Sequence, residues 1–170
     1  EMLDHFGWKW WKKQNPDLDQ VKLELVDIWH FGLSEMLRSG PVDEGLAAQL
    51  SAIEVADANA PADARAENFR LSIEELAAAC LATRSFYLPS FKLPMASLPM
   101  DLPELYAMYI GKNILNRFRQ NNGYKSGEYR KLWQGREDNE HLVELLDELS
   151  DVVEGLPDKL YAGLEARYTA

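Results

Sequence analysis

Apolar residues recur three or four positions apart over several long stretches of the chain, and they nowhere alternate over a strand's length. The clearest stretch runs from Leu18 to Arg38. Two apolar series occupy it, Val21, Leu25 and Ile28 on one side and Leu23, Val26, Leu33 and Leu37 on another. This spacing predicts a helix buried on most sides. Asp17 or Asp19 can cap its start after Pro16, and Gly40 with Pro41 ends it.

Three further helices follow from the same signals. A capping-box pattern from Ser72 to Glu75 predicts a helix that runs to about Arg84. The spacing also predicts helices over 101–120 and 140–154, the last ended by Gly155 and Pro157. We expect connecting segments at 41–70 and 85–103, where the second contains four prolines, and a polar loop at 121–139. The pattern therefore predicts an all-α fold with one domain over 1–170.

Composition and charge narrow the function classes. The chain has 170 residues, 46% of them hydrophobic, with a net charge of −10 and a pI near 4.8. Nucleic-acid binding through clustered positive charge is disfavoured, and no stretch is long and apolar enough for a membrane span. We expect a cytoplasmic protein. The single Cys80, in an apolar run, is interpreted as a buried structural thiol.

Two carboxylates interrupt the first long helix. Glu24 and Asp27 are three residues apart, so they share one helix face and repel each other. The sequence from Leu23 to Leu37 holds no Lys or Arg that could neutralise them. Either a divalent metal ion such as Mg²⁺ or Mn²⁺ meets them, or a cation from another helix does. His30, one turn further on, is open to three interpretations: a core histidine bonded to a carbonyl, a substrate contact or a metal ligand.

Basic and aromatic residues gather in two other places. The segment 7–13 holds three Trp and three Lys, which fits either base stacking with phosphate contact or a Trp-rich cover over the helices. Lys112, Asn116 and Arg119 fall at i, i+4 and i+7, and Asn113 flanks them. They lead into the loop 121–139, whose glycines and cations suit a polyphosphate, although a solvated surface loop remains the alternative. Because this loop holds few aliphatic residues, we expect it to be mobile without a ligand.

Taken together, these segments resemble the dimeric all-α dUTPases, which belong with the MazG-like pyrophosphohydrolases. The resemblance spans most of residues 1–142. It is carried by four segments in order and by three later positions: Trp8-Lys-Trp-Trp11, Glu24-Leu-Val-Asp27-Ile-Trp-His30-Phe31, Gly111-Lys-Asn-Ile-Leu-Asn-Arg-Phe-Arg119-Gln, Gly123-Tyr-Lys-Ser-Gly-Glu-Tyr-Arg-Lys131, and Trp133, Gly135 and Glu137-Asp-Asn139. Such a resemblance implies a compact helical bundle of the all-α NTP pyrophosphohydrolase type, completed by homodimerisation.

The resemblance also implies a metal site. The family uses an E-x-x-E pair and an E-x-x-D pair, and Glu24 with Asp27 fits the second. By its distance to Trp8, Glu1 fits the later member of the first pair, whose earlier member would precede residue 1. We therefore expect the N-terminal helix to be missing from this chain, the alternative being an altered site that uses Asp4. Glu1, Glu24 and Asp27 are the implied metal ligands and catalytic residues, for two or more Mg²⁺ ions with Mn²⁺ as a possible substitute.

The remaining implied roles concern the nucleotide. Trp10, His30, Asn113 and Asn116 would contact base or sugar, and Lys112, Arg119, Tyr124, Lys125 and Lys131 the phosphates. The hypothesis is hydrolysis of dUTP, with dUDP as a second substrate, to dUMP with release of pyrophosphate. One alternative is a dCTP or broader (d)NTP pyrophosphohydrolase. Another, of a different class, is a non-catalytic helical dimer that binds a nucleotide or a protein partner.

Overall fold

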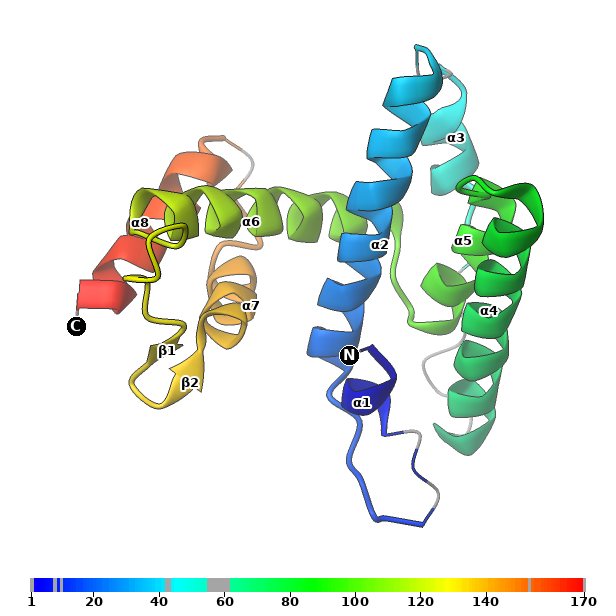
Figure 1. Ribbon diagram of the computed structural model, residues 1–170, viewed down its shortest axis with the longest axis horizontal. Helices are drawn as coiled ribbons and strands as arrows, with labels where there is room; N and C mark the ends of the chain where they lie inside the picture. Colours follow the sequence, from blue (N-terminus) through cyan, green and yellow to red (C-terminus); the bar gives the residue numbers. More distant parts are fainter. Residues whose placement is uncertain are drawn as a thin grey trace. The chain divides into compact units, whose positions relative to one another are not determined.

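A computed structural model of the chain describes residues 2–7, 9, 11–41, 44–54, 62–152 and 154–169, without the side chains of 62–64. The chain divides into two compact units, Glu1–Leu105 and Tyr106–Ala170, and each is described by itself (Figure 1). Apart from one short hairpin, the regular elements of the described residues are helices, so the predicted all-α class is confirmed. The prediction of one domain over the chain stays a prediction.

The first unit is built on α2, Leu18–Ser39, with α1, Met2–Phe6, packed beside it. Asp17 caps α2 by accepting a hydrogen bond from the backbone N–H of Gln20 at 3.2 Å. Gly40 ends the helix. These bounds agree with the predicted ones to within a residue. The helix is less enclosed than predicted, because Leu37 is 58% exposed and Phe31 77%.

Three predictions for the first unit are wrong. The predicted connecting segments leave out the first half of α4, Ala62–Thr83, and α5, Leu88–Ser97, whereas α3, Leu46–Ser51, lies in the segment 44–55, whose sequence is weakly helical. Ser72 therefore lies inside α4, where its hydroxyl donates to the Phe69 carbonyl at 2.7 Å instead of capping a helix start. Cys80 is half-buried and not buried.

Helix α5 forms despite its prolines. Pro89 lies in the first turn, where a missing backbone N–H costs no helical hydrogen bond. Pro94 lies inside the helix and is buried with Phe91 and Met95, so burial of apolar surface offsets the hydrogen bond that Pro94 cannot make.

Aromatic side chains join the helices of the first unit. Phe6 of α1 lies 4.6 Å from Phe69 of α4, and Trp29 of α2 stacks at 5.4 Å on Phe91 of α5. Gly32 allows the close approach of α2 to Phe86, since a Cβ at this position would lie 2.5 Å from that ring. The face of α2 that carries Trp29 is thereby fixed against α5 and against Phe86, in the connection before α5.

The second unit contains most of α6, Leu102–Asn121, which agrees closely with the predicted helix over 101–120. A hairpin follows, with β1, Leu132–Trp133, antiparallel to β2, Arg136–Glu137. Its two turn residues, Gln134 and Gly135, both have positive φ, as a tight two-residue hairpin requires. The next helix is α7, Asp138–Glu148, and the sequence prediction missed α8, Leu156–Thr169, entirely.

Apolar side chains of α6, α7 and α8 form the core of this unit. Five of these side chains are at most 1% exposed: Leu115, Phe118, Leu142, Leu160 and Leu164. The segment 122–137 is held by aromatic rings: Trp133 is 2% exposed, and Tyr129 stacks on Tyr168 of α8 at 5.5 Å with an angle of 7°. The expectation that this loop lacks the apolar area to hold itself down is therefore wrong. No helix among the described residues is long and apolar enough to cross a membrane.

Candidate active site

Glu24 and Asp27 lie one turn apart on α2, at the edge of its buried face. Leu23, Leu25 and Val26 beside them are fully buried. Glu24 is half-buried, and the Asp27 side chain is 39% exposed. The helical period thus turns the aliphatic residues toward the core and leaves both carboxylates partly in contact with solvent.

His30 continues the same face. Its Nδ1 lies 3.0 Å from the Val26 carbonyl and 3.9 Å from Oδ1 of Asp27. Because a carbonyl only accepts, Nδ1 carries the proton, and in the neutral ring Nε2 is then the acceptor. The structure thus shows the carbonyl bond of His30, which fixes the ring beside the Asp27 carboxylate, and the partly exposed ring is compatible with a substrate contact as well.

The chemistry of this pair suits Mg²⁺. Proteins commonly bind that ion through one or two carboxylates together with substrate phosphates, and Glu24 with Asp27 supplies two. No group of three or more candidate ligands occurs among the residues that the structure describes. Glu1 and Trp10, predicted as metal ligand and base contact, lie outside those residues. Asp4, the alternative ligand, pairs with Lys9 at 2.8 Å.

Helix α6 brings together only part of its predicted polar face. Asn116 is exposed and accepts a hydrogen bond from Nη1 of Arg119 at 3.2 Å. Asn113 is exposed as well, and its side-chain amide donates to the Tyr109 carbonyl at 2.9 Å. Lys112, in contrast, is only 4% exposed, so it does not share the solvent-facing surface of the two asparagines.

The loop after α6 presents the remaining predicted phosphate residues. Gly123, with φ of +89°, turns the chain so tightly that a Cβ there would lie 2.9 Å from Cβ of Glu128. Tyr124 is 56% exposed and Lys125 is exposed. Lys131 lies 3.2 Å from the Glu137 carboxylate, so part of its charge is already balanced.

Sequence reasoning missed Asp138, the first residue of α7. Its side chain is fully buried, and its two carboxylate oxygens accept hydrogen bonds from Nε and Nη2 of Arg119, both at 2.8 Å. The Tyr129 hydroxyl donates to the same carboxylate at 2.8 Å. Although Asp138 belongs to the quoted Glu137-Asp-Asn139 motif, the spacing of the sequence did not connect it to Arg119, 19 residues earlier.

Burial and pairing shift the ionisation of this group. Desolvation, followed by the hydrogen bond to Asp138, raises the pKa of Tyr129 far above its usual value, so the phenol stays protonated. Burial opposes the charge of Arg119, but its hydrogen bonds and attraction to Asp138 prevail and raise its pKa. Tyr129 and Arg119 therefore both keep their protons across the neutral pH range.

A family model described as dUTPase matches residues 1–124, which is more than half of the chain. The chain belongs to the dUTPase family. A comparison with curated proteins gave no match. The dUTPase match covers α2 and α6, and with them Glu24, Asp27, His30, Lys112, Asn113, Asn116, Arg119 and Tyr124. Lys125, Lys131 and Asp138 lie beyond it, so the resemblance over 125–142 rests on the motifs alone.

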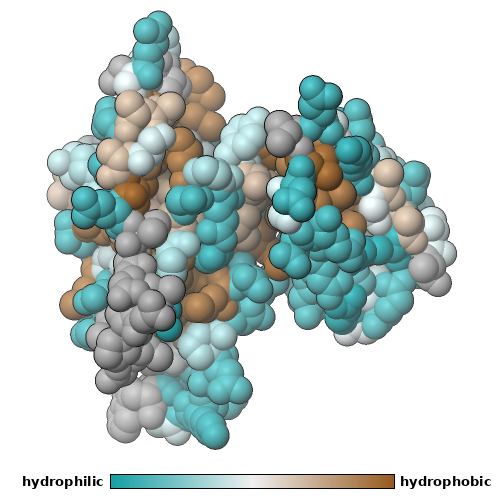
Figure 2. Space-filling model, turned by 180° about the vertical axis from the view of Figure 1, so that it is seen from behind, coloured by the Kyte–Doolittle hydropathy of each residue, from teal (hydrophilic) through white to brown (hydrophobic). Residues whose placement is uncertain are grey.

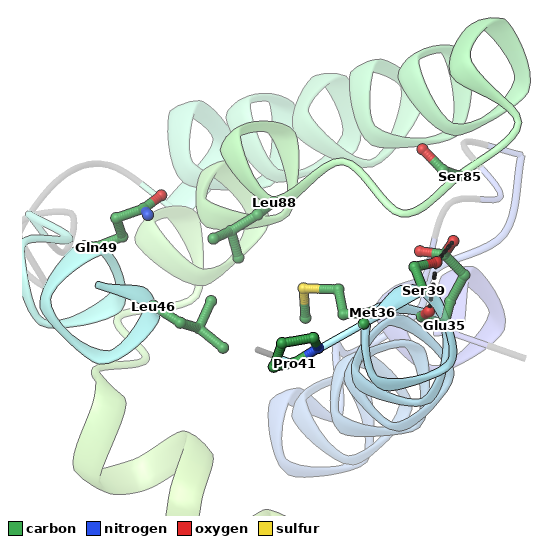
Figure 3. Close-up of a pocket in the computed structure, with 9 residues that line it drawn as sticks. Glu35, Met36, Ser39, Pro41, Leu46, Gln49, Ser85 and Leu88 are labelled. Atoms are coloured by element: carbon green, nitrogen blue, oxygen red, sulfur yellow. Dashed lines mark hydrogen bonds between the residues drawn. The ribbon is translucent and has the colours of Figure 1, made fainter. Parts of the chain in front are cut away.

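The dUTPase chain also has a cavity of about 520 Å³ at the far end of α2, between α2, α3 and the connection to α5. Met36, Pro41, Leu46 and Leu88 face one another across it, and Glu35 accepts a hydrogen bond from Ser39 at its rim (Figure 3). Glu35 is eight residues beyond Asp27, or roughly 12 Å along a helix. The residues that line this cavity include none of the predicted site residues.

Proposed function

We propose that this member of the dUTPase family hydrolyses dUTP, and dUDP as a second substrate, to dUMP, with pyrophosphate as the product released from dUTP. Glu24 and Asp27 would hold Mg²⁺, with Glu1 as a further ligand. The bound ion would neutralise phosphate charge and lower the pKa of a coordinated water.

The roles of the protein's own side chains follow from their chemistry. His30, held by the Val26 carbonyl and Asp27, would contact the base, with Trp10 as its aromatic neighbour in the pocket. Asn113 and Asn116 would contact the sugar, and Arg119, Tyr124, Lys125 and Lys131 the phosphates, whereas the burial of Lys112 removes it from the predicted phosphate contacts. Positioning and charge stabilisation would supply most of the rate, as is usual for phosphoryl chemistry.

One observation carries the proposal: an E-x-x-D pair at the solvent edge of a buried helix, inside the segment that matches the dUTPase family. Two carboxylates one helical turn apart repel each other, and they form a donor set that suits a divalent ion. A metal ion that also binds substrate phosphate accounts for their retention at this edge.

A nucleotide panel tests the proposal. We expect the full-length protein with Mg²⁺ to hydrolyse dUTP faster than dCTP or dTTP, with pyrophosphate as the product identified by ion chromatography, and chelation of the metal to stop the reaction. Faster turnover of dCTP would move the assignment to the cytosine-specific alternative. No hydrolysis of any nucleotide, with metal present, would favour the non-catalytic alternative.

We further propose that the protein is a homodimer. Hydrophobic residues are exposed among hydrophilic ones on the face drawn in Figure 2. The first unit exposes Phe31 to 77% and Leu81 to 80%, and burying such side chains against a second copy of the chain would be favourable. We expect light scattering at micromolar concentration to give twice the chain mass of 19.4 kDa. A monomeric mass would contradict the dimer and leave the fold untouched.

A further inference from the structure

The Asp138 carboxylate ties together three segments of the second unit. Arg119 comes from α6, Tyr129 from the loop, and Asp138 itself begins α7. The backbone N–H of Asp138 also donates to the Lys131 carbonyl at 3.0 Å. One buried side chain and its own amide thus fix α6 and both ends of the segment 129–131 relative to α7.

The pairing sets which edge of the Arg119 guanidinium stays available. Asp138 takes the Nε and Nη2 edge, and Nη2 also donates to Asn139 at 3.4 Å. The Nη1 edge is turned toward Asn116, which is exposed on α6. A guanidinium has two hydrogens on Nη1, so this edge can donate to a ligand oxygen while it contacts Asn116.

The loop that carries the cations is fixed by the same carboxylate. Tyr129 donates its hydroxyl to Asp138, and its ring is stacked on Tyr168. Tyr124 lies 6.0 Å from the Tyr129 ring, measured between ring centres. The donors on this loop are therefore ordered during folding, and a ligand does not have to supply the free energy of ordering them.

We propose that Asp138 is a positioning residue for polyphosphate binding: it holds Arg119, Tyr129 and the loop so that a di- or triphosphate meets preformed N–H and O–H donors. The proposal rests on the proposed function in that the phosphates are taken to be those of dUTP. Asp138 itself touches no substrate, because its side chain is fully buried and both of its oxygens have partners in the protein.

Charge and position predict opposite results for one substitution. Asp138→Asn removes a negative charge beside Arg119, and attraction alone would make a polyphosphate bind more tightly. If Asp138 positions the donors, the same change weakens binding, since the ligand must then supply the free energy of ordering them.

The test measures calorimetric binding of inorganic pyrophosphate and of the non-hydrolysable analogue α,β-imido-dUTP, both with Mg²⁺. We expect Asp138→Asn to weaken both on the order of 10- to 100-fold per folded molecule, and Tyr129→Phe, which keeps the ring stack and the charge, to weaken both by a smaller factor. The matched control is Glu144→Gln. Glu144 is also a carboxylate between two arginines of this unit, Arg136 and Arg167, so the control makes the same change in net charge.

Unchanged or tighter binding by folded Asp138→Asn would overturn the inference. If that variant does not fold, unchanged affinity in Tyr129→Phe overturns the inference. A loss of affinity in Glu144→Gln as large as that in the variants at Asp138 or Tyr129 overturns it as well. A wild-type chain that binds pyrophosphate without hydrolysing dUTP would refute the proposed function, and weaker binding by Asp138→Asn would still support the positioning role. A wild-type chain that binds neither probe would refute both.

Discussion

Asp27→Asn should slow dUTP hydrolysis on the order of 100- to 1,000-fold, the range seen when one group that stabilises transition-state charge is lost. An amide is a poorer Mg²⁺ ligand than a carboxylate of the same shape. The fold should persist. Because the Asp27 side chain is 39% exposed, the change buries no new polar group, and removing one of two neighbouring anions relieves repulsion with Glu24. The melting temperature without metal should stay the same or rise.

Glu35→Gln is the matched control for this prediction. Glu35 lies on the same helix, its side chain is 31% exposed, and it belongs to none of the predicted contacts. We expect its activity to equal that of the unchanged chain. A marked fall in the melting temperature of Asp27→Asn, with activity per folded molecule retained, would identify Glu24 and Asp27 as a structural ion-pair site and refute the metal assignment.

Trp133→Ala should destabilise the protein by about 3–5 kcal/mol, which corresponds to a melting temperature lower by roughly 10 °C for a chain of this size. Trp133 is 2% exposed and lies edge-on to Phe118 at 5.7 Å and stacked on His141 at 5.1 Å. Its indole N–H also donates to the Arg130 carbonyl at 2.7 Å. The substitution therefore opens a cavity and removes a hydrogen bond that helps to close the loop.

The neighbouring Leu132→Ala serves as its control in the same hairpin. Leu132 is 61% exposed, so we expect its stability to change by no more than about 0.5 kcal/mol. Thermal unfolding followed by circular dichroism measures both variants without relying on tryptophan fluorescence. Equal stability of Trp133→Ala and Leu132→Ala would show that the aromatic cluster does not hold this unit together.

The helices that could be predicted are those with a long amphipathic repeat. In α2 and α6 the buried positions recur over more than three turns, which makes the helical period clear. Prediction failed where the signals conflict. Pro89 and Pro94 indicate a break, yet packing of Phe91 and Met95 outweighs it in α5. In the same way, Gly155 and Pro157 predict the end of a helix over 140–154, yet α7 already ends at Glu148 and Pro157 lies in the first turn of α8.

The candidate site could likewise be predicted only in part. Glu24 and Asp27 could be predicted because charges inside an apolar repeat stand out within a few residues of sequence. The role of Asp138 could not, since its partners Arg119 and Tyr129 reach it through a turn and a hairpin whose geometry no periodicity encodes. The burial of Lys112 could not be predicted for another reason. Its long aliphatic stem lets a cationic residue occupy a helix face that packs inward.

The stack of Tyr129 on Tyr168 links the loop to a helix terminus, where local unfolding begins most readily. Tyr168 lies in the last turn of α8, and its hydroxyl accepts a hydrogen bond from the Arg130 N–H at 3.3 Å. Each fraying of that turn withdraws both the ring and the hydroxyl from the loop. Opening of the final turn of α8 thus weakens the hold on the loop between α6 and β1, which then depends on the bonds of Tyr129 with Asp138 and of Trp133 with Arg130.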